Sequence, residues 1–290
     1  MSWYMIAVVL IAYIVIAPLA GGLLSGFDRV ITARMQGRQG PPLLQPFYDI
    51  FKLFSKEAIV VNKIQVLMIF AYLIFSVFTG AIFFAGGDIL LVFFALTLAE
   101  MFLMLAACSA SSPYSSMGAQ RELLQMMAYE PMTLLAAIGF YMTSHSFMVS
   151  NIINTDKPAI IKLPGMFIGF AYILIVKFRK SPFDLSTSHH AHQEMVKGLT
   201  TDISGNVYGL VELAEWYENI LMMAFLGMFF VTKDPISWLY AFIACVVVYF
   251  MIILIDNIFP RVKWQSLLWS SWIVTFFAGG ANFLALTVLK

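Results

Sequence analysis

A short polar segment of the chain holds three of its four histidines. Its ionisable side chains are His189, His190, His192 and Glu194. Imidazole and carboxylate groups bind zinc, but structural zinc sites usually combine ligands from two separated places, with CxxC or i,i+4 spacing. Imidazole groups also exchange protons near neutral pH. We predict that this segment binds no metal and serves as a polar surface on which a partner docks, with zinc binding and proton uptake as alternatives.

A second set of chemically capable residues is acidic and lies inside apolar stretches. The candidates for a proton pathway are Glu100, Glu130, Glu212 and Glu215, and Glu218 and Asp256 are possible further members. A carboxylate at the centre of a bilayer costs about 3 kcal/mol or more and usually marks a route for ions or protons. For Glu218 and Asp256 the alternative is a hydrogen bond to a neighbouring helix or a place at the membrane interface.

Three of these acids recur at intervals of three residues. On a helix, Glu212, Glu215 and Glu218 would share one stripe about 120° wide. If the span starts at residue 208, they lie about 6, 10 and 15 Å from its start. This spacing favours a path that begins under the adjoining loop and runs into the membrane.

The elements that must position these residues are membrane helices. Of 290 residues, 61% are hydrophobic and only 11% are charged, whereas about a quarter are charged in an average soluble domain. Runs of about 20 apolar residues can cross a bilayer, and lipid leaves no partner for the backbone of open strands. The runs lie at about 2–24, 65–86, 88–108, 126–149, 160–178, 208–231, 236–259 and 266–288. We predict an all-α integral membrane protein of about eight transmembrane helices in one membrane domain, residues 1–290.

The N-terminal run and the two cysteines are expected to play structural roles. The opening run has no basic region before it and exceeds a signal peptide's apolar core, so we expect a retained span. Cys108 and Cys245 both stand in apolar runs and are expected to be buried hydrophobic side chains. Two cysteines are too few for an iron–sulfur cluster, which usually takes four.

The basic residues divide unequally between the loops. The odd-numbered loops carry six, one, four and two Lys or Arg residues, and the even-numbered loops and the C-terminus carry four in all. The positive-inside rule therefore places the odd loops in the cytoplasm and both termini outside, in the cell membrane. The two long loops, about 25–64 and 179–207, would face the same side.

The first long loop combines a basic turn with an amphipathic stretch. Arg34 and Arg38 stand among glycines and prolines, and guanidinium groups suit carboxylates and phosphates. The following LLQPFYDIFKLFSKE predicts a helix in the membrane interface that starts at Gln45 or Pro46. It either tethers the loop or forms a platform for a soluble partner, and the turn favours the platform. The third loop should be polar, and Pro131 should break or kink the helix after Glu130.

Motifs for several enzyme classes are missing from the sequence. It shows no nucleophile triad, phosphate-binding loop or dinucleotide fingerprint. We therefore expect any redox centre to lie in other subunits, and we expect no nucleic acid among the partners.

Five motifs in order resemble one family. The sequence has GPP after an Arg-rich turn, then LLQPFYDIFKLFSKE, GAQRELLQMMAYE, SPFDLS and a glutamate pair in ELAEWYE. Together they resemble the NuoH family of complex I and its counterparts in membrane-bound NiFe hydrogenases, over essentially the whole chain. The histidines that follow PFD replace the acidic residues of the NuoH form, and this variant is similar to Ech-type and Mbh-type energy-converting hydrogenases. The formate hydrogenlyase branch, with a THHELT loop, fits less well.

The resemblance implies a function and a set of site residues. It implies a non-catalytic membrane subunit of a ferredoxin-dependent NiFe hydrogenase, coupled to proton or sodium translocation beside antiporter-like subunits. The NiFe centre and iron–sulfur clusters would lie in the partner subunits. Glu130, Glu212 and Glu215 match acids on the family's path into the membrane, whereas Glu100 is assigned by depth alone. The residues implied to face the soluble hydrogenase large and small subunits are Arg34, Arg38, Pro182, Phe183, Asp184, His189, His190, His192 and Glu194.

Three other functions remain open. The chain could be the quinone-site subunit of complex I or a relative, although the acidic loop of NuoH is missing. It could be an autonomous ion transporter, although we see no internal repeat of the kind such proteins often carry. It could also be a purely structural anchor, against which the submerged acids argue.

Overall fold

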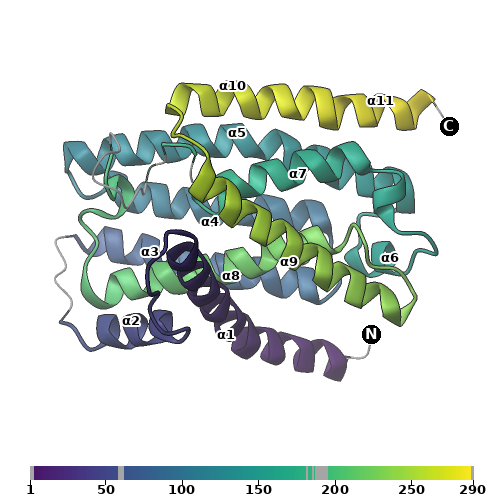
Figure 1. Ribbon diagram of the computed structural model, residues 1–290. Helices are drawn as coiled ribbons and strands as arrows, with labels where there is room; N and C mark the ends of the chain where they lie inside the picture. The colour runs from purple at the N-terminus through teal and green to yellow at the C-terminus, as the bar shows by residue number, and fades with distance from the viewer. Residues whose placement is uncertain (1–2, 58–61, 181, 185, 187–194, 289–290) are drawn as a thin grey trace. The chain divides into compact units, whose positions relative to one another are not determined.

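The fold is a set of membrane helices joined by short connections. The structure is a computed structural model and describes residues 3–57, 62–180, 182–184, 186 and 195–288. The helices are α1 (Trp3–Met35), α2 (Gln45–Phe54), α3 (Lys63–Phe84), α4 (Ile89–Cys108), α5 (Pro113–Ser144), α6 (Val149–Ile153), η1 (Ala159–Ile161), α7 (Pro164–Lys177), η2 (Gly198–Thr200), α8 (Gly205–Gly227), α9 (Pro235–Ile258), α10 (Trp264–Val274), the π-helical η3 (Thr275–Gly280) and α11 (Ala281–Val288) (Figure 1). Within these ranges only isolated β-bridges occur, and no strand.

The predicted fold class is confirmed. Among the described residues, six helices are long and apolar enough to cross a membrane: α1, α3, α4, α5, α9 and the continuous helical stretch from α10 to α11. The fifth and sixth predicted spans correspond to α7, which has only 14 residues, and α8, which carries three glutamates. The chain is an all-α integral membrane protein.

The chain divides into two compact units, each with its own core. Unit 1 comprises Met1–Phe84, Ala95–Leu123 and Asp184–Ile220, and unit 2 comprises Ala85–Phe94, Leu124–Phe183 and Leu221–Lys290. In unit 1, α1 packs against α2 and α3 (Figure 1). Its core joins α3, α4 and α8 through Tyr72, Leu103 and Val211, all at most 1% exposed.

The core of unit 2 contains a cluster of phenylalanine rings. The ring of Phe225 on α8 lies 4.8 Å from Phe93, 5.5 Å from Phe140 and 4.6 Å from Phe170, between ring centroids. Phe229, two residues beyond the end of α8 at Gly227, also contacts Phe140, with 4.7 Å between the ring centroids. Phenylalanine pairs in these tilted and edge-to-face arrangements contribute beyond their buried area. They hold parts of α4, α5, α7 and α8 together.

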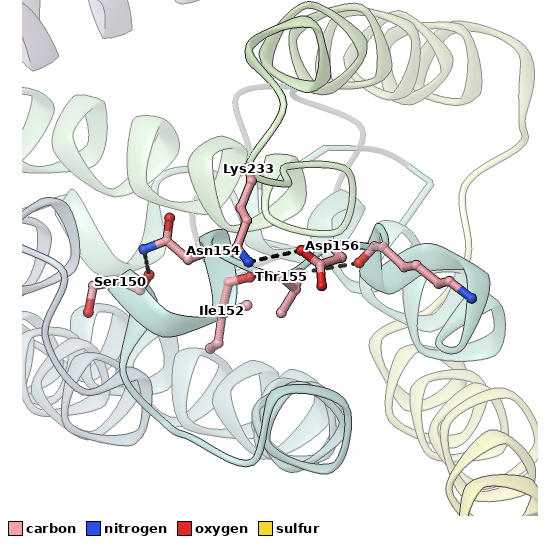
Figure 2. A network of polar contacts seen from close by, with 7 residues as sticks. Ser150, Ile152, Asn154, Thr155, Asp156 and Lys233 are labelled. Atoms are coloured by element: carbon pink, nitrogen blue, oxygen red, sulfur yellow. Dashed lines mark hydrogen bonds and ion pairs between the residues drawn. The ribbon is translucent and has the colours of Figure 1, made fainter.

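In unit 2, polar contacts surround the loop that follows α6. Lys233 Nζ lies 2.9 Å from Asp156 Oδ1, and Asn154 Nδ2 donates to the Ser150 carbonyl oxygen (Figure 2). The Lys233 backbone N–H also donates to the Thr155 carbonyl at 3.2 Å. The hydrogen bond and charge of Lys233 hold the pKa of Asp156 below its ordinary value. These contacts join the loop before η1 to the loop before α9.

Two predicted loop boundaries are wrong. Helix α1 runs to Met35 and contains Arg34, so the first long loop does not begin at about residue 25. The sequence after Gly26 has no helix breaker until Gly37, whose φ of 68° suits the left-handed position that ends a helix. In the resulting cap, the Arg38 N–H donates to the Ala33 carbonyl at 2.8 Å. The basic turn is therefore shorter than predicted.

The third loop was also predicted too long. Helix α5 begins at Pro113, because proline suits a first helical turn and Ser112 caps it, with its backbone oxygen accepting from the Ser116 N–H at 3.0 Å. The helix is not broken at Pro131, which lies inside it. The predicted start of the amphipathic helix α2 at Gln45 is confirmed.

The last membrane helix contains a π-helical turn that sets its rotational register. The Tyr172 hydroxyl donates to Ser270 Oγ at 2.7 Å, and Asn282 Oδ1 accepts from the Met166 N–H at 3.1 Å. In an uninterrupted α-helix, positions 270 and 282 would differ by about 120° around the axis. The π turn takes up one additional residue and reduces this difference to about 20°. Both side chains can therefore contact α7.

Replacing Asn282 with alanine is expected to destabilise unit 2. The change removes the bond to Met166 and a second one, in which Asn282 Nδ2 donates to the Lys162 carbonyl at 3.0 Å. Two lost hydrogen bonds at a partly exposed site correspond to about 1–2 kcal/mol. The readout is the thermal unfolding midpoint in detergent, with Asn154→Ala as the matched control because its amide makes one exposed bond within its own turn. Equal midpoints for the two variants would contradict this role.

Candidate functional site

Asp184 and Ser186, which precede the histidine segment, are bound by side chains of helix α5 within unit 1. Arg121 Nη1 lies 2.9 Å from Asp184 Oδ2, and the two side chains are only 17% and 9% exposed. The neighbouring Glu122 is buried, and its carboxylate accepts a hydrogen bond from the Ser186 hydroxyl. Charged groups at such burial are stable only when paired. Helix α5 therefore fixes the chain on the N-terminal side of the segment.

The other side of the segment is held by the first turns of the same helix. The Tyr114 hydroxyl accepts from the Val196 N–H at 2.7 Å and donates to the Val196 carbonyl at 2.9 Å. A Cβ atom added to Gly118 would lie 2.5 Å from the backbone of Gly198, so glycine is needed there. We call the contacts of α5 with Asp184, Ser186, Val196 and Gly198 the segment base.

Of the predicted docking residues, some belong to the segment base and others lie at the surface. Phe183 and Asp184 are 5% and 8% exposed, which favours a supporting role for them. The Pro182 carbonyl accepts from the Val262 N–H at 2.7 Å. His189, His190, His192 and Glu194 lie outside the described residues. Arg34, in the last turn of α1, and Arg38, which contacts Gln36, are exposed.

The amphipathic helix α2 is attached to α1 by an ion pair. Arg29 Nη1 lies 2.6 Å from Asp49 Oδ2, and Gln45 Nε2 donates to Asp49 Oδ1 at 3.0 Å. Partial burial acts to raise the pKa of Asp49, but these hydrogen bonds and the charges of Arg29 and Lys52 lower it overall. At 40% exposure of each partner the pair contributes at most about 1 kcal/mol. It orients α2 more than it stabilises it.

Four of the six predicted pathway acids lie in unit 1. On α8, Glu212 accepts a hydrogen bond from the Tyr208 hydroxyl at 2.8 Å, and the buried Glu218 accepts from Ser76 Oγ at 3.1 Å. Glu215 is partly buried, and Glu100 on α4 is 3% exposed. Because α8 begins at Gly205, three residues before the predicted span, Glu212, Glu215 and Glu218 lie about 10, 15 and 20 Å from the start of the helix, about 5 Å more than predicted.

The remaining two acids belong to unit 2. Glu130 is partly buried on α5, and its backbone oxygen accepts from Thr133 Oγ1. Asp256 on α9 lies 3.6 Å from Lys180 Nζ, which fits the alternative of a local partner for this acid. A continuous path through all six acids stays a prediction.

Sequence reasoning missed the partners of these charged groups. Neither Glu122 nor Ser76 was a candidate, although both are buried: Ser76 binds the candidate Glu218, and Glu122 binds Ser186, two residues after the candidate Asp184. The adjacent Arg121 and Glu122 in GAQRE, near the start of an apolar helix, are the one available signal for the segment base. Across the described ranges no three His, Cys, Asp or Glu side chains gather as a metal site. The histidine segment lies outside those ranges, so the absence of a metal there stays a prediction.

Comparison with known proteins identifies relatives over most of the chain. Hydrogenase-4 component C of Escherichia coli is 28% identical over 236 residues, which cover 76% of this chain and 72% of that protein. Formate hydrogenlyase subunit 4 of the same organism is 27% identical and covers 71% of each chain. The NuoH subunit of the NADH-quinone oxidoreductase of Rhodospirillum rubrum is 26% identical, over 98% of this chain and 94% of that protein.

A solved structure shares the fold. A chain of the membrane-bound sulfane sulfur reductase, an archaeal respiratory membrane complex, superposes with a TM-score of 0.85 at 23% identity, over 97% of this chain and 99% of that one. The family model described as NADH dehydrogenase matches residues 6–287. Because this match spans nearly the whole sequence, the chain belongs to the NADH dehydrogenase family of membrane subunits, the NuoH family.

Proposed function

We propose that this chain anchors the soluble subunits of a ferredoxin-dependent NiFe hydrogenase to the membrane and couples their electron transfer to proton or sodium translocation. Its relatives are membrane subunits of oxidoreductase complexes, and this chain is a subunit of the same kind. The NiFe centre and iron–sulfur clusters would reside in the soluble large and small subunits. Antiporter-like membrane subunits would carry most of the ions.

The segment base is the observation that carries the proposal. It holds both flanks of a histidine-rich segment on one helix through the Arg121–Asp184 pair and the Tyr114–Val196 contacts. A docking surface must be positioned by rigid supports if its partner is to be held in one orientation. The exposed Arg34 and Arg38 would add positive charge for carboxylates of the same partner. Docking on the cytoplasmic side, with both termini outside, is part of the proposal.

A local arrangement supports the coupling role. The acids of α8 are spaced by about 4.5 Å along the helix axis, and Tyr208 and Ser76 supply hydroxyl groups to Glu212 and Glu218. Carboxyl and hydroxyl groups at such intervals can pass protons when water bridges them. Electron transfer in the docked subunits would change the charge near the start of α8 and thereby the protonation of Glu212 and Glu215. Glu100 and Glu130 would extend this path.

A second candidate function is a quinone-site subunit of a complex I relative. The match to the NuoH subunit of a NADH-quinone oxidoreductase covers 98% of this chain and favours it. The histidines after PFD and the hydrogenase relatives favour the hydrogenase. The two functions differ in the metal of the soluble partner and in the electron acceptor.

Purification of the intact complex through a tag on this chain decides between them. We expect nickel to co-purify and reduced ferredoxin to support hydrogen evolution without added quinone. Activity that requires quinone, in a preparation without nickel, would overturn the hydrogenase proposal in favour of the second candidate. Ion transport by this chain alone in liposomes would instead indicate an autonomous transporter.

Breaking the segment base is expected to weaken docking. Arg121→Ala leaves Asp184 buried without this partner, which typically costs about 3–5 kcal/mol, whereas Arg121→Ala with Asp184→Ala should cost less. The readout is the amount of soluble hydrogenase subunits that remain bound to the tagged chain as salt is raised. The matched control is Lys233→Ala with Asp156→Asn, which removes an exposed ion pair. Retention equal to wild type in Arg121→Ala would contradict the role of the base.

A further inference from the structure

Two basic pairs of unit 2 are brought together by a backbone contact between distant loops. Phe183 and Val262 form an isolated parallel bridge, and the Val262 N–H donates to the Pro182 carbonyl at 2.7 Å. The basic residues on the two sides of this contact are Arg179 and Lys180 before it, and Arg261 and Lys263 around Val262. An acidic group, Asp256, lies 3.6 Å from Lys180. The junction thus combines these four basic residues with one acidic residue, so its net charge is positive.

The second pair is the part of this junction that can bind an anion. Lys263 is exposed, and the Nη1 atom of Arg261 is buried with no hydrogen-bond acceptor among the described residues. A buried guanidinium N–H without an acceptor is costly. An anion at this position would satisfy it, and the neighbouring Lys263 would add a second charge.

The surroundings of this pair are those of a membrane interface. Arg261 and Lys263 stand between the end of α9 at Ile258 and the start of α10 at Trp264. Both α9 and the stretch from α10 to α11 are long and apolar enough to cross a membrane. The neighbouring side chains are large, apolar and exposed, namely Ile258 at 69%, Phe259 at 56%, Trp269 at 73% and Trp272 at 38%. Tryptophan and basic residues gather where headgroups meet acyl chains. A soluble acidic partner would not cover such a surface.

We propose that Arg261 and Lys263 bind the headgroup of an anionic phospholipid whose acyl chains lie against the exposed face of α9 and α10. The phosphate accepts from the guanidinium of Arg261, and Lys263 supplies the second charge. The bound lipid then rests against the loop that holds Pro182, two residues before Asp184 in the sequence. This site depends on the membrane fold and not on which redox module the chain anchors.

Lipid retention by the purified complex tests the site. The complex is reconstituted in nanodiscs of phosphatidylglycerol and phosphatidylethanolamine, extracted in mild detergent and examined by native mass spectrometry. We expect wild type to retain phosphatidylglycerol, and each lost charge to lower its preference over phosphatidylethanolamine about fivefold. Arg261→Ala with Lys263→Ala should abolish the preference, whereas Arg261→Lys with Lys263→Arg should keep most of it.

Lys162→Ala is the matched control. Lys162 is also an exposed basic residue, but it lies just before the start of α7, whereas Arg179 and Lys180 of the junction follow the end of α7. Four results would overturn the proposal. One is unchanged phosphatidylglycerol retention in the double alanine variant. Another is an equal loss in the control. The third is loss of soluble subunits from the double alanine variant while its lipid preference stays at the wild-type value, which would assign the pair to a protein partner. Displacement of the lipid by inorganic phosphate alone would assign it to a free anion.

Discussion

Burying charge in a chain surrounded by lipid is the constraint on which this structure depends. The guanidinium of Arg121 and the carboxylate of Asp184 meet at 2.9 Å with little exposure, and Glu122 next to them is bound by Ser186. None of these groups is stable in an apolar environment alone. The same contacts that neutralise them attach the polar segment to a membrane helix. Stability of the membrane domain and presentation of the segment therefore have one physical cause.

The same constraint explains where the acids of α8 find partners. Glu212 and Glu218 each accept a hydrogen bond from a hydroxyl group, which is polar without carrying a charge of its own. A hydroxyl group can donate a hydrogen bond to a carboxylate and accept one from a carboxyl group. The proposed proton path relies on such hydroxyl groups beside Glu212 and Glu218.

Hydropathy and motif order were enough to predict the membrane fold and the family, because both depend on residue type along the chain. Every predicted span corresponds to a helix, and the amphipathic helix begins at Gln45 as expected. The ends of α1 and α5 were not predicted, since polar residues such as Arg34 and Arg121 are helical here. Pairing between distant positions, such as Arg121 with Asp184, depends on the tertiary fold, and periodicity carries no information about it. The π turn that aligns Asn282 with α7 could not be predicted from the sequence for the same reason.

The central claim is that Glu212 and Glu215 link electron transfer to ion movement. Its most direct test is the number of ions transported per hydrogen molecule by the intact complex in proteoliposomes, compared between wild type and Glu212→Gln with Glu215→Gln. Asp156→Asn, in an exposed loop of unit 2, is the control. The account predicts that the double variant still evolves hydrogen but transports fewer ions per molecule, while the control keeps the wild-type ratio. A wild-type ratio in the double variant would contradict it.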